Sequence, residues 1–135
     1  MAEDPRRRLG AKGEALAARH LEQRGYEIVD RNFRSRHGEL DLIAAGKGCL
    51  VFCEVKTRVA RDGSTELGPL ASVGARKQRQ VRQMAREWLA ARRSGLAGGL
   101  PELAGRLPEL RFDAIGVTLD RGGELVALEH LDGAF

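Results

Sequence analysis

The sequence contains few aromatic residues, with one tryptophan, one tyrosine and four phenylalanines among 135 residues. A core must therefore be packed mainly with leucine, valine, isoleucine and alanine, and the hydrophobic fraction of 42% is large enough to fill one. The scarcity of aromatic rings also argues against glycoside hydrolysis by paired carboxylates, because sugar-binding clefts are usually lined with such rings.

Cysteines are also few, and the two present, Cys49 and Cys53, lie in one run of β-forming residues. Four residues of extended chain span about 13 Å, which exceeds the reach of a disulfide. We therefore expect both to be small buried apolar residues of a reduced, cytoplasmic protein. The three histidines, His20, His37 and His130, lack metal-ligand spacing with these cysteines, so no zinc site is predicted.

No long apolar run, signal peptide or lipidation motif is visible, which predicts a protein without a membrane partner. The length predicts a single domain over residues 1–135. The net charge of +4 favours an anionic partner, of which nucleic acid is the commonest. Only four of the 23 basic residues are lysine, so a lysine at a particular position carries more information than an arginine.

Residues 38–58 contain two β-forming runs around a glycine-containing break, a pattern that predicts a β-hairpin. A loop of two or four residues places Asp41 opposite Glu54, with side chains about 5 Å apart, whereas a three-residue loop turns Asp41 to the other face. The same registers place Glu39 opposite Lys56. Because side chains alternate along a strand, Glu54 and Lys56 share a face. Two carboxylates and an ammonium are therefore expected to converge.

Opposed carboxylates repel one another and need a cation. One solution is a structural salt bridge from Lys56. The other is a divalent cation, Mg²⁺ with Mn²⁺ as a substitute, because Mg²⁺ takes oxygen ligands and commonly uses one or two carboxylates. Asp41 and Glu54 would then be the metal ligands. Lys56 would orient an attacking water and offset charge on phosphate, and Glu14 would hold a second ion or a metal-bound water.

The remaining elements follow from the spacing of apolar residues. Two helices are predicted, at 9–24 and from about 70 to 93. Further strands are predicted at 26–34, 110–119 and 124–129. Three segments are expected to lack regular structure: a loose basic arm at 1–8, a mobile loop at 59–69 and an excursion at 94–109. The last four residues are expected to fray.

Charged residues occupy distinct faces of the two predicted helices. In the first, Glu14 shares a face with the core positions Ala18 and Leu21. In the second, Lys77 lies on the inward stripe, where it either snorkels or reaches the carboxylates. Arginines cover another face of the second helix, which fits either a solvated surface or phosphate contact. The candidate nucleic-acid-binding residues are Arg34, Arg36, Arg58, Arg76, Lys77 and Arg79.

These motifs together resemble those of the YraN family of small bacterial proteins, within the PD-(D/E)XK nuclease superfamily. The matching pieces are GEA at 13–15, GELDLIA at 38–44, VFCEVKTR at 51–58, Lys77 and RFD at 111–113. The pairing of GELDLIA with FxEVKTR at this spacing is specific, whereas an isolated E-x-K is weak. The superfamily has a proline before the aspartate, where this chain has Leu40.

The resemblance implies an α/β fold with the αβββαβ core of restriction endonucleases, a mixed central sheet flanked by helices. It also implies Asp41 and Glu54 as metal ligands, Lys56 as the catalytic lysine and Glu14 as a supporting acid. For Asp113 we find no chemical role, and we expect it to be a partner for Arg111 or for a loop amide.

The function these observations favour is a Mg²⁺-dependent endonuclease acting on DNA, including branched DNA, since the family is similar to Holliday junction resolvases. One alternative is a nucleic-acid-binding module that keeps the fold without catalysis. A weaker one is a scaffold that recruits a protein through the loop at 59–69. Small domains that act on two-fold substrates often work as homodimers, so a homodimer is a further option.

Overall fold

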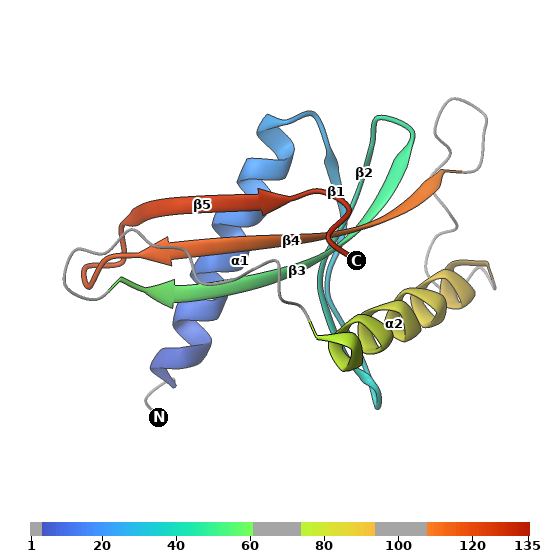
Figure 1. Cartoon of the computed structure of the whole chain (residues 1–135), viewed down its shortest axis with the longest axis horizontal. Helices are drawn as coiled ribbons and strands as arrows, with labels where there is room; N and C mark the ends of the chain where they lie inside the picture. The colour runs from blue at the N-terminus through green and yellow to red at the C-terminus, as the bar shows by residue number, and fades with distance from the viewer. Residues whose placement is uncertain (1–3, 61–73, 94–107) are drawn as a thin grey trace.

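The structure, a computed structural model, describes residues 4–60, 74–93 and 108–135 (Figure 1). Two helices and five strands make up these ranges. In chain order they are α1 (Pro5–Gln23), β1 (Glu27–Ser35), β2 (Gly38–Gly46), β3 (Cys49–Val59), α2 (Ala75–Arg93), β4 (Glu109–Leu119) and β5 (Leu125–Leu131).

The five strands form one sheet in the order β1-β2-β3-β4-β5. Neighbouring strands are antiparallel except β3 and β4, which are parallel and are separated in the chain by α2. The predicted mixed sheet with its αβββαβ order is thus confirmed, with β5 added at the edge. This architecture is consistent with a restriction-endonuclease-like core.

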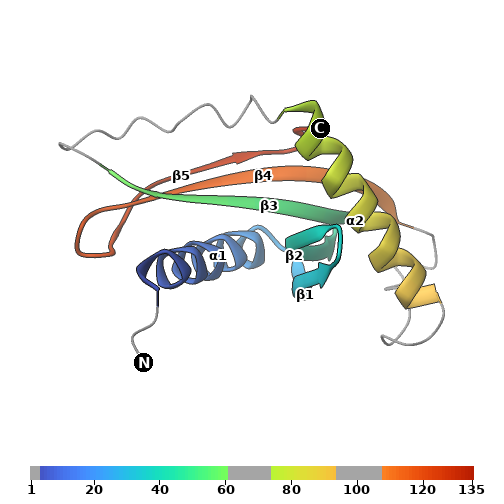
Figure 2. The same ribbon diagram turned by 90° about the horizontal axis from the view of Figure 1, so that it is seen from below.

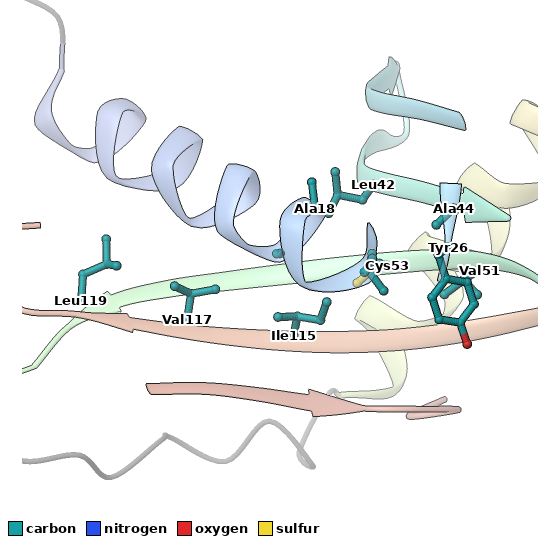
Figure 3. Close-up of a cluster of buried hydrophobic side chains, with 11 residues drawn as sticks. Ala18, Tyr26, Leu42, Ala44, Val51, Cys53, Ile115, Val117 and Leu119 are labelled. Atoms are coloured by element: carbon teal, nitrogen blue, oxygen red, sulfur yellow. The ribbon is translucent and has the colours of Figure 1, made fainter. Parts of the chain in front are cut away.

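The two helices cover opposite faces of the sheet (Figure 2). Small residues of α1, including Ala17 and Ala18, pack with Leu21 against residues of β2, β3 and β4 (Figure 3). On the other face, Trp88 of α2 packs edge-on against Phe52 of β3, with ring centroids 5.9 Å apart. The described apolar residues of the inward faces predicted for both helices are therefore buried.

The hairpin of β2 and β3 closes through a two-residue loop, so that Gly46 pairs with Cys49. Both loop residues have positive φ, 53° at Lys47 and 76° at Gly48, as a type I′ turn requires. This is one of the two registers predicted to bring the acids together. Both cysteines are free thiols. Cys53 is buried as predicted, whereas Cys49, next to the hairpin loop, is only half-buried.

Positions 5–8 and the last four residues are more ordered than predicted. The helix begins at Pro5 rather than at Leu9, because the Asp4 side chain accepts a hydrogen bond from the Arg6 amide (3.0 Å) and caps it. The basic arm at 1–8 is therefore helical from position 5. The tail does not fray, because the Ala134 amide donates to the Phe112 carbonyl at 2.7 Å.

Two of the segments expected to be irregular lie largely outside the described residues. Of the loop at 59–69, only the first two positions are described, and there the Ala60 amide donates to the Leu119 carbonyl at 2.7 Å. Of the excursion at 94–109, the last two positions are described, and Glu109 already begins β4. In the ranges that are described, neither helix combines the length and apolar character needed to cross a membrane.

Candidate functional site

The candidate site lies where β2 and β3 separate. Their ladder runs from Gly46–Cys49 to Leu42–Cys53 and ends one residue short of the predicted Asp41–Glu54 pair. Beyond that point the Asp41 carboxylate lies between the strands and accepts a hydrogen bond from the Val55 amide at 2.8 Å. Asp41 therefore lies beside Glu54 as predicted, although its partner on β3 is a backbone amide.

The regular alternation of side chains between the two faces of the sheet is interrupted in β2 at Asp41, where the ladder with β3 ends. Leu40 and Ile43 both belong to the core under α2, whereas Leu42 belongs to the core under α1. Regular alternation would place residues 40 and 42 on one face, so the strand turns over at Asp41. At this position a carboxylate oxygen of Asp41 lies within 4.8 Å of carboxylate oxygens of Glu14 and Glu39, which belong to α1 and β2.

Asn32 of β1 lies next to this irregularity, and its backbone has a φ of 51°. With its amide nitrogen turned toward the carboxylates, Asn32 donates to Glu14 Oε2 at 2.9 Å and to Glu39 Oε1 at 2.7 Å. Asparagine tolerates the left-handed region better than most residues. One side chain thus links an acid of α1 to an acid of β2.

Glu14 reaches the sheet because α1 approaches β3 very closely at the preceding residue. A Cβ atom on Gly13 would lie 1.7 Å from Thr57 Oγ1, so no larger residue fits without a shift. The resulting position brings carboxylate oxygens of Glu14, Glu39 and Asp41 within 4.8 Å of one another. We call these three residues and Glu54 the acidic cluster.

Glu54 carries a buried carboxylate oxygen without a partner among the described residues. Its Oε1 is 3.1 Å from Lys77 Nζ, and the side chain is only 12% exposed. Its Oε2 is buried and has no hydrogen-bond partner among the described residues. Lys77 therefore reaches the carboxylates, which decides between the two predicted alternatives. Lys56 is exposed, and its charge acts on Glu54 through space.

Burial and repulsion between neighbouring carboxylates raise the pKa values of Asp41, Glu54 and Glu14. Burial, together with the charges of Glu54, Glu14 and Glu39, raises the pKa of Asp41 to about 7. The hydrogen bond from the Val55 amide lowers this pKa but does not outweigh the rise. Burial also raises the pKa of Glu54, although Lys77 and Lys56 oppose the rise. The pKa of Glu14 is raised by burial and by Glu39. Without an added cation, the cluster therefore holds a proton near neutral pH.

The donor set of the acidic cluster suits Mg²⁺. All four side chains offer carboxylate oxygens, which are the ligands of hard divalent cations. Glu54 Oε2 has no hydrogen-bond partner among the described residues, and burial with the charges of Glu54 and Glu14 raises the pKa of Asp41, which a bound cation would reverse. These residues therefore fit such an ion.

The predicted nucleic-acid-binding residues fall into two groups. Arg34 forms an ion pair with Glu39 at 3.4 Å, and Arg36 is exposed in the turn between β1 and β2. Arg58 donates from Nε to Thr118 Oγ1 at 3.2 Å, so part of its guanidinium serves the sheet. The other group, on α2, consists of Arg76, Lys77 and Arg79.

Asp113 has a structural role, as predicted. Arg111 forms a two-point contact with its carboxylate at 2.8 and 2.9 Å, and the Gly133 amide donates to it at 3.0 Å. His130 lies 2.7 Å from the same carboxylate. Burial alone would raise the pKa of Asp113, but the hydrogen bonds from His130, Arg111 and Gly133 outweigh it and lower the pKa to about 2.

Asp113→Asn is expected to lower the free energy of unfolding at pH 7 by about 2 kcal/mol or more, because it leaves Arg111 without its buried partner. The folded-state pKa lies below the ordinary value of 3.8, so this stabilisation is present above pH 4 and is lost as the pH falls toward 2. Urea unfolding at several pH values should show a shallower acid dependence in the variant. Equal acid dependence in Asp113→Asn and wild type would contradict this role.

Two residues of the site were not predicted from the sequence. The predicted hairpin register directs Glu39 toward Lys56, so sequence reasoning does not assign Glu39 to the site. On β1, Glu39 pairs with Arg34, and the Glu39 carboxylate is oriented toward the Asn32 amide. The only sequence signal for Asn32 was the polar interruption of an otherwise apolar run, which does not specify a positive φ.

Comparison with known proteins identifies relatives over nearly the whole chain. The model of the uncharacterised protein family UPF0102 matches residues 13–117. A UPF0102 protein of Rhodococcus opacus is 42% identical over 127 residues, covering 94% of this chain and 95% of its own. Those of Geobacter metallireducens and Moorella thermoacetica are each 40% identical, covering 94% and 96% of this chain and 91% and 97% of their own. None of these names states an activity.

Proposed function

Because the chain belongs to the uncharacterised protein family UPF0102, the YraN family, whose name states no activity, we propose a function from the acidic cluster: Mg²⁺-dependent hydrolysis of phosphodiester bonds in DNA. Branched DNA of the Holliday-junction type is the first substrate to test, given the resemblance to resolvases.

The observation that carries this proposal is the accumulation of four carboxylates around one point of a basic protein. Two neighbouring cations, Lys77 and Arg34, each pair with one acid, Glu54 and Glu39. Asp41 has no ion-pair partner among the described residues, and its pKa is raised to about 7. A purely structural cluster would be expected to pair its buried acids, so this arrangement supports a site prepared for a divalent cation.

The acids of the cluster, Lys56 and Asn32 have different roles in the proposed reaction. Asp41 and Glu54 would hold Mg²⁺, with Glu14 and Glu39 as further oxygen donors. When bound, the ion would supply Lewis-acid stabilisation of charge on the phosphoryl oxygens. Lys56 extends into solvent next to Glu54, from where its ammonium would contact a phosphate oxygen or orient a water. Asn32 would keep Glu14 and Glu39 aligned.

The test is a cleavage assay with purified protein on branched, duplex and single-stranded DNA. We expect cleavage with Mg²⁺ or Mn²⁺ and none with EDTA. Glu54→Gln should lose at least about a hundredfold in rate, because it removes the charge of a ligand whose side chain is only 12% exposed. A matched control is Glu129→Gln, which removes the same charge from β5.

Equal residual cleavage in wild type and Glu54→Gln would assign the activity to a contaminant and contradict the proposal. A DNA affinity that falls with rising salt but is unchanged by divalent ions and by Glu54→Gln would instead indicate a binding module without catalysis.

A further inference from the structure

A basic groove is lined by residues of α2 and by His37 in the turn between β1 and β2. Its volume is about 900 Å³. Its basic lining residues are His37, Arg76, Lys77, Arg79, Arg82 and Arg86. Three of these, His37, Arg82 and Arg86, were not among the predicted nucleic-acid-binding residues.

The turn between β1 and β2 is held against α2 by a compact set of hydrogen bonds. Ser35 Oγ donates to Glu87 Oε2 at 2.6 Å, and Gln80 Nε2 donates to the His37 carbonyl at 2.9 Å. His37 Nδ1 contacts the other oxygen of Glu87. The groove therefore has a fixed wall, and Nε2 is the ring nitrogen of His37 that remains for a ligand.

The positive charge of the groove is largely uncompensated. Helix α2 carries seven arginine and lysine residues and a single acid, Glu87, which is occupied by Ser35 and His37. Arg76 and Arg79 have no ion-pair partner in the described part of the chain. Arg86 donates to the neutral Gln83 at 2.9 Å, and Arg82 lies over the Phe112 ring at 5.3 Å. Such a groove attracts an extended polyanion.

The spacing of these cations suits a nucleic-acid strand. At 1.5 Å per residue, the helix between Arg76 and Arg86 is about 15 Å long. That distance corresponds to roughly four nucleotides at about 3.4 Å of rise per nucleotide along a duplex strand. Guanidinium groups also match phosphate oxygens in two-point contacts.

The groove is continuous with the acidic cluster, because Lys77 lines the groove and also pairs with Glu54. An anionic membrane is a poorer partner, since the apolar residues Val81, Met84 and Trp88 of α2 are buried in the core and cannot enter lipid.

We propose that this groove binds the sugar–phosphate backbone of a nucleic-acid strand on one side of the bond to be cut. The substrate is then a polynucleotide that extends about four nucleotides from the acidic cluster, rather than a nucleotide or a short end. This inference rests on the proposed function, whose site it extends.

The experiment measures binding of a fluorescent 16-nucleotide DNA by anisotropy in EDTA, where cleavage does not interfere. The variant is Arg82→Gln combined with Arg86→Gln, both exposed residues of the groove. The matched control is Arg19→Gln combined with Arg121→Gln, which removes equal charge from exposed positions of α1 and the β4–β5 turn. Circular dichroism checks the fold of both.

The groove variant should bind at least about tenfold more weakly at 0.1 M salt, and the slope of log Kd against log salt should fall by about two. The control should change Kd less than twofold. The mononucleotide dAMP should not compete at concentrations where the unlabelled 16-mer does, and neither should poly-L-glutamate at equal charge.

Equal Kd values in the groove variant and the control would overturn the inference, as would competition by poly-L-glutamate as strong as that by DNA. The two proposals fail separately. DNA binding that depends on the groove, without cleavage in Mg²⁺, contradicts only the proposed nuclease activity. Cleavage that is unaffected by loss of the groove arginines contradicts only the proposed role of the groove.

Discussion

Replacing Asp41 with asparagine is expected to lower the rate of Mg²⁺-dependent DNA cleavage about a thousandfold, or ~4 kcal/mol of transition-state stabilisation. Asp41 lies at the centre of the acidic cluster, since Glu14, Glu39 and Glu54 all act on its pKa. Asparagine keeps the shape and can still accept the hydrogen bond from Val55. The loss would therefore report the missing charge rather than a distorted strand.

The same substitution should stabilise the metal-free protein at alkaline pH. The folded-state pKa of Asp41 is about 7, above the ordinary value of 3.8, so folding of the wild type becomes less favourable as the pH rises from about 4 to 7. Asparagine does not titrate, so we expect the free energy of unfolding of Asp41→Asn to exceed that of wild type by roughly 1–2 kcal/mol at pH 8 in EDTA. Glu22→Gln, an exposed change on α1, is the control for charge.

A variant Asp41→Asn that is less stable than wild type at pH 8 in EDTA would show that the carboxylate stabilises the fold. A structural salt-bridge cluster predicts that outcome. Loss of cleavage together with a gain of stability is instead the pattern expected of a functional acid.

Trp88→Ala is expected to lower the free energy of unfolding by ~3–5 kcal/mol. The Trp88 ring is 1% exposed, packs against Phe52 and donates from Nε1 to Asp30 Oδ2 at 2.8 Å. The substitution leaves a cavity under α2 and removes one donor to Asp30, which keeps the Arg31 amide and Arg92 as partners. Urea unfolding followed by far-UV circular dichroism is the suitable measurement, because the chain has only this tryptophan.

Trp88→Phe separates the two contributions of this residue. It keeps most of the ring packing but removes the indole donor, so its loss of stability should be clearly smaller than that of Trp88→Ala. A loss below about 1 kcal/mol in Trp88→Ala would mean that α2 is not anchored by this contact. The groove on its outer side would then lack the fixed position on which our second proposal depends.

Much of the fold could be predicted because its signals are local. The hairpin of β2 and β3 follows from two β-forming runs around Lys47-Gly48, and a type I′ turn fixes the register. The inward faces of α1 and α2 follow from apolar residues at helical spacing. The sequence pattern also brought Asp41 and Glu54 to one place, because pairing in a hairpin depends only on the loop.

The rest of the site depends on departures from regular structure. The strand β2 turns over at Asp41, and Asn32 beside it has a positive φ. Secondary-structure propensities do not indicate which residue of a strand will adopt such a conformation. Glu39 therefore faces Asn32 and Glu14 rather than Lys56. The wall of the groove arises from contacts of Glu87 with a turn some fifty residues away, which a pattern within one helix cannot reveal.

Calorimetric titration of Mn²⁺ into wild type and Asp41→Asn at pH 7.5, without DNA, tests the central claim most directly, because it asks whether the acidic cluster binds a divalent cation. We predict a saturable heat for wild type, with proton release from the cluster, and at least a tenfold weaker or undetectable heat for the variant. Absence of binding to wild type, or equal binding to both proteins, would contradict the account.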